Sequence, residues 1–324
     1  MNNYSLLQRF LHRSVLSSKL IREITFDIEQ SIFFKKYDQY DDSHVFVTGL
    51  ARSGTTSLLN AIYDSNQFAS LTYDDMPFIL APNFWKKISP SKSHTILQER
   101  AHGDSVIVST NSPEAFEEVF WKTFNNDSKN KNELFKKFIS LVLKKNYKTR
   151  YLSKNNQNIR RLELICEISP HSIILIPFRD PLQQSLSLLS QHIKFSDLQK
   201  QDRFIREYMK WIGHSEFGMD YKEISSHKIL YPDVFSLNHW LEQWHATYSS
   251  ILHLSKKNDA LYFICYESLC NDPKVWVEIK NLLKINQDNL FLFKESKKDI
   301  NQNFDSTLYD KCLKLYESLV VSSL

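Results

Sequence analysis

Residues 49–56 combine glycines, an arginine, a serine and threonines at a spacing that suits an anion. They read Gly-Leu-Ala-Arg-Ser-Gly-Thr-Thr and follow the apolar run 44–48, which predicts a buried parallel strand. A loop between such a strand and a helix points backbone N–H groups inward, so a phosphate or sulfate group can bind at the helix N-terminus. The spacing of Gly49 and Gly54 matches the loop of nucleoside triphosphatases, but Thr55 replaces its lysine. We therefore expect anion binding without the means of holding a Mg²⁺-bound triphosphate.

A second pair of candidate anion ligands lies in 172–192. An apolar run ends at Arg179, and Asp180 and Pro181 suit the N-cap and first turn of the helix that follows. Ser187 lies further along this helix, so a guanidinium fork and a hydroxyl can clamp one phosphate together. Each motif also has a structural alternative: a plain strand-to-helix connection for the first, and a helix-capping pair beside a solvated serine for the second.

Together, the two motifs resemble those of the sulfotransferases that use 3′-phosphoadenosine 5′-phosphosulfate (PAPS). In that family, a basic residue followed by Ser-Gly-Thr-[Thr/Ser] binds the 5′-phosphosulfate, and Arg-[Asp/Asn]-Pro with a later serine binds the 3′-phosphate. The resemblance implies that the 5′-phosphosulfate is bound by Arg52, Ser53, Gly54, Thr55, Thr56 and Ser57. It also implies that Arg179 and Ser187 bind the 3′-phosphate.

Two further segments are similar to parts of the same family. Lys154 lies where the family has a Lys-Thr-Pro or Lys-Asn-Pro segment, although Asn156 replaces the proline. The resemblance implies that this lysine reaches the transferred sulfuryl group, whereas the alternative is an ordinary surface lysine. The run 260–269 ends in Tyr-Glu-Ser-Leu and resembles the family's late strand with its capped helix.

Sulfuryl transfer to a hydroxyl also needs a base for the acceptor proton. The resembling families often use a carboxylate shortly beyond the loop cation, and Asp74 and Asp75 lie there. We favour Asp75, because it lies closer to Pro77, which restrains the backbone before it; the alternative is an aspartate pair that caps a turn. His102 is a third candidate for the base.

Two clusters could line an acceptor pocket. One contains His102 and continues through Glu114, Glu118 and Trp121, and the other is 211–218 with His214 and Glu216. Surface histidines are the alternative for both imidazoles. A third group, Trp240, Trp244 and Tyr248, recurs at helical spacing and is interpreted as core, with a sugar-stacking wall as the alternative.

The composition predicts one globular domain over 1–324. Hydrophobic residues make up 42% of the chain, which supplies ample core, and 5 glycines argue against long linkers. The apolar stretches are shorter than a membrane span, and 1–43 is expected to be a helical extension packed on the domain rather than on a membrane. The four cysteines form no C-x-x-C pair, which indicates reduced thiols in a cytoplasmic protein. We expect no metal and, at a net charge of +4, no nucleic-acid partner.

Apolar runs and helical patterns alternate along the chain. Strands are expected over 44–48, 68–72, 149–153, 172–178 and 260–266. Helices are expected near 55–65, 113–125, 131–146, 157–168, 181–192, 236–256, 273–284 and 306–320. This order predicts an α/β fold with a central parallel sheet flanked by helices, similar to nucleotide kinases. The insertions 73–148 and 193–258 are expected to form a helical acceptor lobe over the carboxyl ends of the strands, where such sheets bind ligands.

These observations predict a PAPS-dependent sulfotransferase, with PAPS as co-substrate and adenosine 3′,5′-bisphosphate as product. The acceptor is expected to be a hydroxyl of a carbohydrate or glycoconjugate precursor, by analogy with the family. One alternative is a P-loop nucleotide-dependent kinase, which the missing loop lysine disfavours. The other is a nucleotide-binding protein without turnover, which the intact Arg52, Lys154, Arg179 and Ser187 disfavour.

Overall fold

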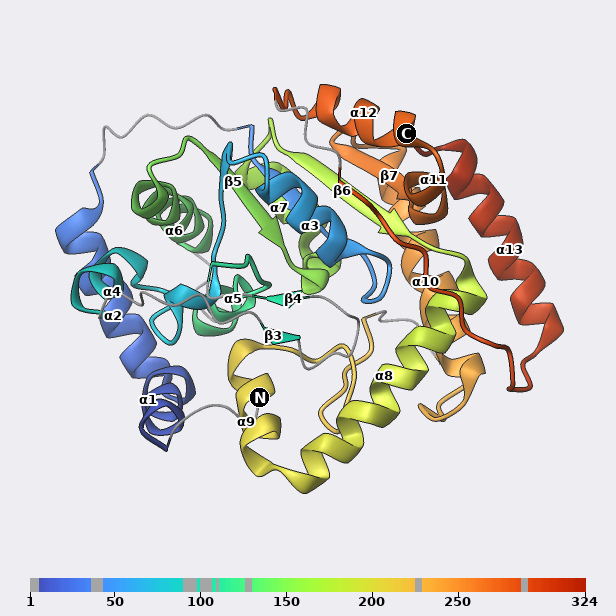
Figure 1. Ribbon diagram of the computed structural model, residues 1–324, viewed down its shortest axis with the longest axis horizontal. Coiled ribbons are helices and arrows are strands. Elements are labelled where there is room, and N and C mark those ends of the chain that lie inside the picture. The colour runs from blue at the N-terminus through green and yellow to red at the C-terminus, as the bar shows by residue number, and fades with distance from the viewer. Residues whose placement is uncertain are drawn as a thin grey trace.

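A parallel β-sheet lies at the centre of the protein (Figure 1). The computed structural model describes residues 6–35, 43–89, 98–99, 107–108, 111–125, 130–224, 229–286 and 291–324. The strands of the central sheet are β1 (Val45–Val47), β2 (Phe68–Ala69), β5 (Arg150–Lys154), β6 (Ile173–Phe178) and β7 (Leu261–Cys265), in the spatial order β2-β5-β1-β6-β7. All of their pairings are parallel. All the expected strands are confirmed, and β2 is shorter than the predicted run 68–72.

Strand β1 shows why these apolar runs became strands. Its side chains alternate between two cores: Phe46 packs into one, and Val45 and Val47 pack into the other. All three side chains are fully buried, as expected for a strand with both faces covered by helices. The sheet is therefore the middle layer of an α/β fold, as the sequence predicts.

Helices cover both faces of the sheet (Figure 1). The face of Val45 and Val47 packs against α3 (Thr55–Tyr63), α11 (Tyr266–Asn271) and α12 (Pro273–Leu282). The face of Phe46 borders a larger core, to which many helices contribute. These include α5 (Glu118–Thr123), α6 (Lys131–Asn146), α7 (Leu162–Ile168), α8 (Pro181–Gln201), α10 (Leu237–Ser255) and α13 (Ser306–Val321). Trp244 and Tyr248 are completely buried in this core, so the core interpretation of these two rings holds.

The N-terminal segment packs on the body of the protein. It forms α1 (Leu6–Ser17) and α2 (Lys19–Phe33), separated at Ser18, whose side chain caps α2. Helix α1 packs against α9 (Arg203–Ile212), and α2 packs against α4 (Pro82–Ile88), α5 and α6. Phe26 of α2 is completely buried. Among the described residues, no helix is both long enough and apolar enough to cross a membrane.

The two long insertions contribute helices to the body of the fold. Within 73–148, α6 packs against β2 and β5, and within 193–258, α10 packs against α8 and α13. A small antiparallel pair, β3 (Gln98–Glu99) and β4 (Ile107–Val108), also lies in the first insertion. The acceptor lobe expected from these insertions stays a prediction.

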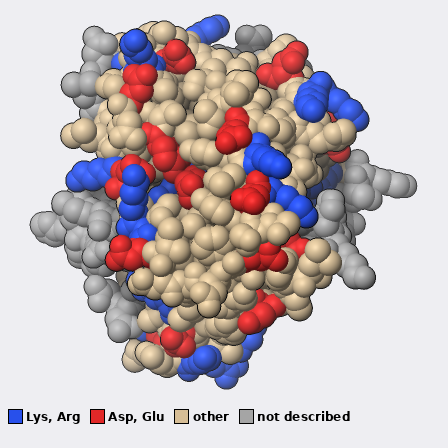
Figure 2. All heavy atoms as spheres, turned by 90° about the vertical axis from the view of Figure 1, so that its right-hand side faces the viewer, with Lys and Arg blue, Asp and Glu red and all other residues tan. Residues whose placement is uncertain are grey.

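Charges of both signs are mixed on the face that lies at the right of Figure 1. Figure 2 shows this face, where lysines and arginines are interspersed with aspartates and glutamates. The described part of this face therefore carries no large patch of a single sign, in line with the small net charge of +4.

Candidate active site

The loop between β1 and α3 has the backbone of an anion-binding site. Arg52 and Gly54 both adopt left-handed backbone conformations, with φ of +70° and +93°. Gly49 packs so closely on β6 that a Cβ there would lie 2.8 Å from the carbonyl oxygen of Pro177. Gly54 is the N-cap of α3, and no side chain caps this helix end. The first N–H groups of α3 are therefore free of a side-chain cap, and they can donate to an anion.

Tyr266, at the start of α11, closes one side of this loop. A Cβ on Gly54 would lie 2.2 Å from Cδ2 of the Tyr266 ring, so the ring packs directly on the glycine. The Tyr266 hydroxyl donates to Ser57 Oγ at 3.3 Å and to the carbonyl of Lys294 at the same distance. The late Tyr-Glu-Ser-Leu segment thus holds the loop in place.

Gln184 of α8 holds the loop from behind. Its Nε2 donates to the carbonyls of Leu50 and Ala51, at 3.3 and 3.1 Å, and its Oε1 accepts from Trp244 Nε1 at 3.0 Å. The residue is completely buried. These contacts hold the carbonyls of Leu50 and Ala51 on the Gln184 side of the loop. Sequence reasoning missed this residue; its position between Arg179 and Ser187 was the available signal.

The two predicted anion motifs meet in the structure. Arg52 Nε donates to Ser187 Oγ at 3.0 Å, although the residues are 135 positions apart in the chain. Arg179 Nη1 donates to the carbonyl of Arg52 at 3.4 Å. The side chain of Arg179 is 8% exposed, and its Nε lies 3.7 Å from Glu267 Oε1. Two cationic side chains and a hydroxyl therefore gather at the carboxyl edge of β1 and β6.

An extended segment, 291–300, crosses this edge. The carbonyl of Ser296 accepts from Arg179 Nη2 at 2.7 Å. The backbone of Lys298 exchanges two hydrogen bonds with the Gln183 side chain, at 2.7 and 3.1 Å. Burial, and then the nearby charge of Arg52, lower the pKa of the Lys298 ammonium. Sequence reasoning missed this segment, because it contains no motif and no regular element.

Lys154 lies at the carboxyl end of β5, paired in register with Val47 of β1. Its side chain is 8% exposed, so it is not an ordinary surface lysine. Its Nζ lies 3.7 Å from Glu114 Oε1, and Glu114 Oε2 accepts from the Tyr73 hydroxyl at 2.9 Å. A cation, a carboxylate and a phenol therefore meet where β1 leads into the anion-binding loop.

The pKa of a second carboxylate, Glu216, is also affected by the charge of Lys154. His214 Nδ1 lies 2.8 Å from Glu216 Oε2. Burial alone would raise the pKa of Glu216, but the charge and hydrogen bond of His214 and the charge of Lys154 outweigh it and lower this pKa to about 2. Glu216 is therefore a buried carboxylate whose ionised form is favoured by its contacts with His214 and by the charge of Lys154.

The three candidates for the base have different outcomes. Asp75 is buried, and its carboxylate accepts from Thr72 N at 2.8 Å and from Lys145 Nζ at 2.6 Å. These contacts support a capping role for Asp75, which was the structural alternative, and its role as the base stays a prediction. Asp74 lies in the same turn, η1 (Tyr73–Asp75), and stays a prediction. His102 lies outside the described residues.

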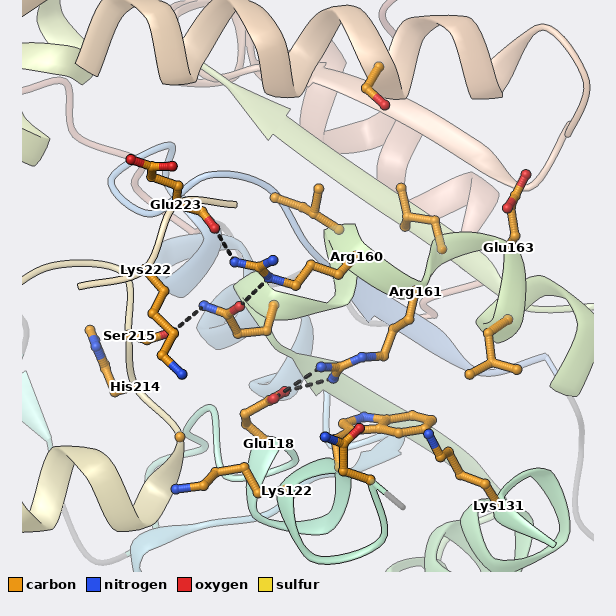
Figure 3. Close-up of a pocket in the computed structure, with 18 of the residues that line it drawn as sticks. Glu118, Lys122, Lys131, Arg160, Arg161, Glu163, His214, Ser215, Lys222 and Glu223 are labelled. Atoms are coloured by element: carbon orange, nitrogen blue, oxygen red, sulfur yellow. Dashed lines mark hydrogen bonds and ion pairs between the residues drawn. The ribbon is translucent and has the colours of Figure 1, made fainter. Parts of the chain in front are cut away.

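A cavity of about 1280 Å³ is lined by residues of α5, α7, α9 and α10 and of the loop that follows α9 (Figure 3). It brings together the two clusters that the sequence analysis singled out, because Glu118 and Trp121 line it together with His214. Its basic lining residues are Lys122, Lys131, Arg160, Arg161, Lys210, Lys222 and Lys257. Its acidic lining residues are Glu118, Glu163, Asp220 and Glu223.

Gln157 and the run 159–164 form one wall of this cavity. Asn155 Nδ2 donates to Glu118 Oε2 at 2.9 Å, and Glu118 in turn accepts from both Nη atoms of Arg161 at 2.6 and 3.0 Å. Gln157 Nε2 donates to Ser215 Oγ at 3.2 Å, which joins this wall to the His214 loop. Asn155, the neighbour of Lys154 in the chain, therefore contacts a residue that lines the cavity.

Comparisons with known proteins agree with this geometry. The family model described as "Sulfotransferase family" matches residues 44–221, a range that includes Arg52, Lys154, Arg179 and Ser187. None of the curated proteins matches the chain. Among solved structures, sulfotransferase STF1 from Mycobacterium tuberculosis is similar at a TM-score of 0.53 and 13% identity, over 88% of this chain and 79% of that one.

Sulfotransferase STF9 from Mycobacterium avium matches with 12% identity and a TM-score of 0.49, over 98% of this chain and 79% of that one. At this identity the likeness to STF1 concerns the fold, which is the P-loop-like fold of these enzymes. The family match covers more than half of the 324 residues. The chain therefore belongs to the sulfotransferase family.

Proposed function

We propose that this sulfotransferase takes its sulfuryl group from PAPS and transfers it to a hydroxyl of a carbohydrate or glycoconjugate precursor. The observation that carries the donor proposal is the contact between Arg52 and Ser187, with Arg179 beside them. Two anion-binding motifs from distant parts of the chain thereby serve one site, as a nucleotide with separate 5′ and 3′ anions requires. The carbohydrate acceptor rests on analogy with the family.

In this proposal, Arg52 to Ser57 and the N-terminus of α3 bind the 5′-phosphosulfate. The 3′-phosphate binds Arg179 and Ser187, so that Arg179 exchanges its carbonyl partners for phosphate oxygens. The site works without metal, because the cationic side chains neutralise a sulfuryl group, which carries less charge than a phosphoryl group.

For the chemical step we propose Lys154 and Glu114 as partners. The acceptor oxygen attacks sulfur while its proton passes to the Glu114 carboxylate, and the bond from sulfur to the bridging oxygen breaks. That oxygen leaves with the electron pair on adenosine 3′,5′-bisphosphate, where the Lys154 ammonium stabilises the charge. The 3.7 Å separation of Lys154 Nζ and Glu114 Oε1 supports this assignment, and the Tyr73 hydroxyl orients the carboxylate.

A kinase is the alternative enzyme class. Thr55 in place of the loop lysine disfavours it, because kinases of the P-loop type use that lysine on the β- and γ-phosphates. Nothing in the geometry around Lys154 specifically favours ATP.

The test is release of adenosine 3′,5′-bisphosphate from PAPS, in the presence of EDTA and a panel of saccharide acceptors. We expect acceptor-dependent release by the wild type, and a loss of about 100-fold in kcat for Glu114→Gln. Glu133→Gln is the matched control, since Glu133 is an exposed residue of α6 paired with Lys137. Production of ADP from Mg-ATP, without turnover of PAPS, would contradict the proposal.

A further inference from the structure

Among the described residues, the cavity of Figure 3 is lined by more basic than acidic side chains. Two of its acidic side chains already have cationic partners: Glu118 binds Arg161, and Asp220 lies 3.2 Å from Lys210 Nζ. Asp220 also binds Arg206, which lies outside the lining. Of the remaining charged residues that the structure describes in the lining, five are basic and two are acidic: Lys122, Lys131, Arg160, Lys222 and Lys257, against Glu163 and Glu223.

Lys122 and Arg160 show this imbalance most directly. The Lys122 ammonium donates to the carbonyl of Lys210, and Arg160 donates to Gln157 Oε1 at 2.9 Å and to the carbonyl of Glu223. These acceptors are neutral. Burial, followed by neighbouring cations, lowers the pKa of both Lys122 and Arg160, in each case against the attraction of Glu118.

Several of these charged side chains extend into the cavity together. Figure 3 shows Lys222, Arg160 and Arg161 extending into the same space, with Glu163 at its margin. Lys122, Arg160 and Lys222 are exposed to solvent, and like charges held close together raise the free energy of the empty site, whereas an anion placed among them lowers it.

The position of the cavity connects it with the transfer reaction. One wall is formed by Gln157 and the run 159–164, and the lining residue Glu118 accepts from Asn155, the chain neighbour of Lys154. Another wall is the loop of His214. Glu216 lies in the same loop, and the charge of Lys154 is one of the causes that lower its pKa. Lys154 does not itself line the cavity, and the connection between them runs through Asn155 and Glu216.

We propose that this cavity binds the anionic part of the acceptor, so that the acceptor is an acidic saccharide bearing carboxylate, phosphate or sulfate groups. This inference rests on the proposed function, because it assigns the cavity to the acceptor of that reaction. It narrows the acceptor class, since a neutral saccharide would leave the cations of Lys122, Lys222 and Arg160 without a counter-ion.

The test is calorimetric titration of the protein saturated with adenosine 3′,5′-bisphosphate. The probes are a heparin-derived tetrasaccharide, which carries carboxylates and sulfates, and cellotetraose as its neutral counterpart. We expect at least tenfold tighter binding of the acidic probe, weakening as salt rises. The variant Lys122→Gln/Lys222→Gln is expected to lose about tenfold in affinity for it, because it lacks two partly exposed charges.

The control variant is Lys87→Gln/Lys200→Gln, which removes the same charge from exposed positions on α4 and α8. It is expected to bind the acidic probe like the wild type. Equal affinity for the two probes, or equal losses in the two double variants, would overturn the inference. So would a single-stranded oligonucleotide that binds through Lys122 and Lys222 more tightly than the saccharide.

The same titrations separate this inference from the donor proposal. Affinity for adenosine 3′,5′-bisphosphate is measured first and is expected to be the same in both double variants and the wild type. Failure of the wild type to bind this nucleotide contradicts the PAPS proposal. Normal nucleotide binding without preference for the acidic probe contradicts the cavity assignment alone.

Discussion

Gly54→Ala is the perturbation whose effect follows most directly from the loop geometry. An added Cβ would lie 2.2 and 2.3 Å from two carbons of the Tyr266 ring. Ordinary carbon contacts are about 3.5–4.0 Å, so the ring or the loop must move by more than 1 Å. The ring is not free to move, because its hydroxyl donates to Ser57 and to the carbonyl of Lys294.

Two contributions set the size of the effect. The left-handed backbone of Gly54, with φ of +93°, costs an alanine about 1–2 kcal/mol. Overpacking against a fixed ring costs about 1–3 kcal/mol more. We therefore expect Gly54→Ala to lower the free energy of unfolding by about 2–5 kcal/mol. It should also lower the affinity for adenosine 3′,5′-bisphosphate by at least tenfold, because the loop N–H groups shift.

A double-mutant cycle separates the two contributions. Tyr266→Ala alone is expected to cost about 3–5 kcal/mol, since it empties the space of a buried ring. In the double variant the overpacking disappears while the backbone cost remains. The double variant should therefore lose about 1–3 kcal/mol less stability than the sum of the losses in the two single variants. Urea unfolding measures all the terms. A Gly54→Ala protein within about 0.5 kcal/mol of the wild type, with normal nucleotide affinity, would refute the reasoning.

Three further predictions concern the site itself. Arg179→Ala should weaken adenosine 3′,5′-bisphosphate by about 1.5–3 kcal/mol in calorimetry, because it removes a charge-assisted clamp; equal affinity would remove Arg179 from the site. Lys154→Ala should lower kcat by about 100-fold with little change in nucleotide affinity, and an unchanged kcat would leave Lys154 without a role in transfer. Because the pKa of Glu216 is lowered to about 2 in the folded state, its contribution to stability is present above its usual pKa and is lost as pH falls from about 4.5 to 2. Acid titrations of unfolding should show a smaller loss over this window for Glu216→Gln, and identical curves would contradict the assignment.

The strands could be predicted because local pattern and tertiary environment agree. Runs such as 172–178 are apolar throughout, and in a parallel sheet both faces of these strands are buried. The helix expected near 157–168 was only partly right, since it begins as the 3₁₀ segment η2 (Asn156–Arg161) before α7. There the Asn155 side chain accepts from Gln157 N, which favours a tight turn.

Helix α9 was missed although its signals were present. Asp202 caps its N-terminus, and Gly213 ends it in a left-handed conformation. Between them, Ile205, Tyr208 and Met209 form a buried stripe at helical spacing. Here the residue types would have been sufficient, whereas the short helices α4 and α11 offer little pattern to detect.

Some residues of the candidate site could also be predicted from the sequence, and others could not. Arg52 and Arg179 could be chosen from the sequence because each follows a strand whose carboxyl end must reach the same sheet edge, and Ser187 lies in the helix that begins just after Arg179. The approach of Glu114 to Lys154 could not be inferred, because no spacing in the chain relates them and only the packing of the first insertion sets it. The prediction of Asp75 as the base relied on chain position, which could not show the contacts with Thr72 and Lys145 that give this side chain a capping role.

The central claim is that two separate anion clamps on this chain bind the 5′ and 3′ phosphates of one nucleotide. The most direct measurement is calorimetric titration, in the presence of EDTA, with adenosine 3′,5′-bisphosphate and with adenosine 5′-monophosphate. The account predicts tighter binding of the bisphosphate by about 1.5–3 kcal/mol, the contribution expected from the clamp of Arg179 and Ser187. Equal affinities for the two nucleotides, or binding that requires Mg²⁺, would contradict it.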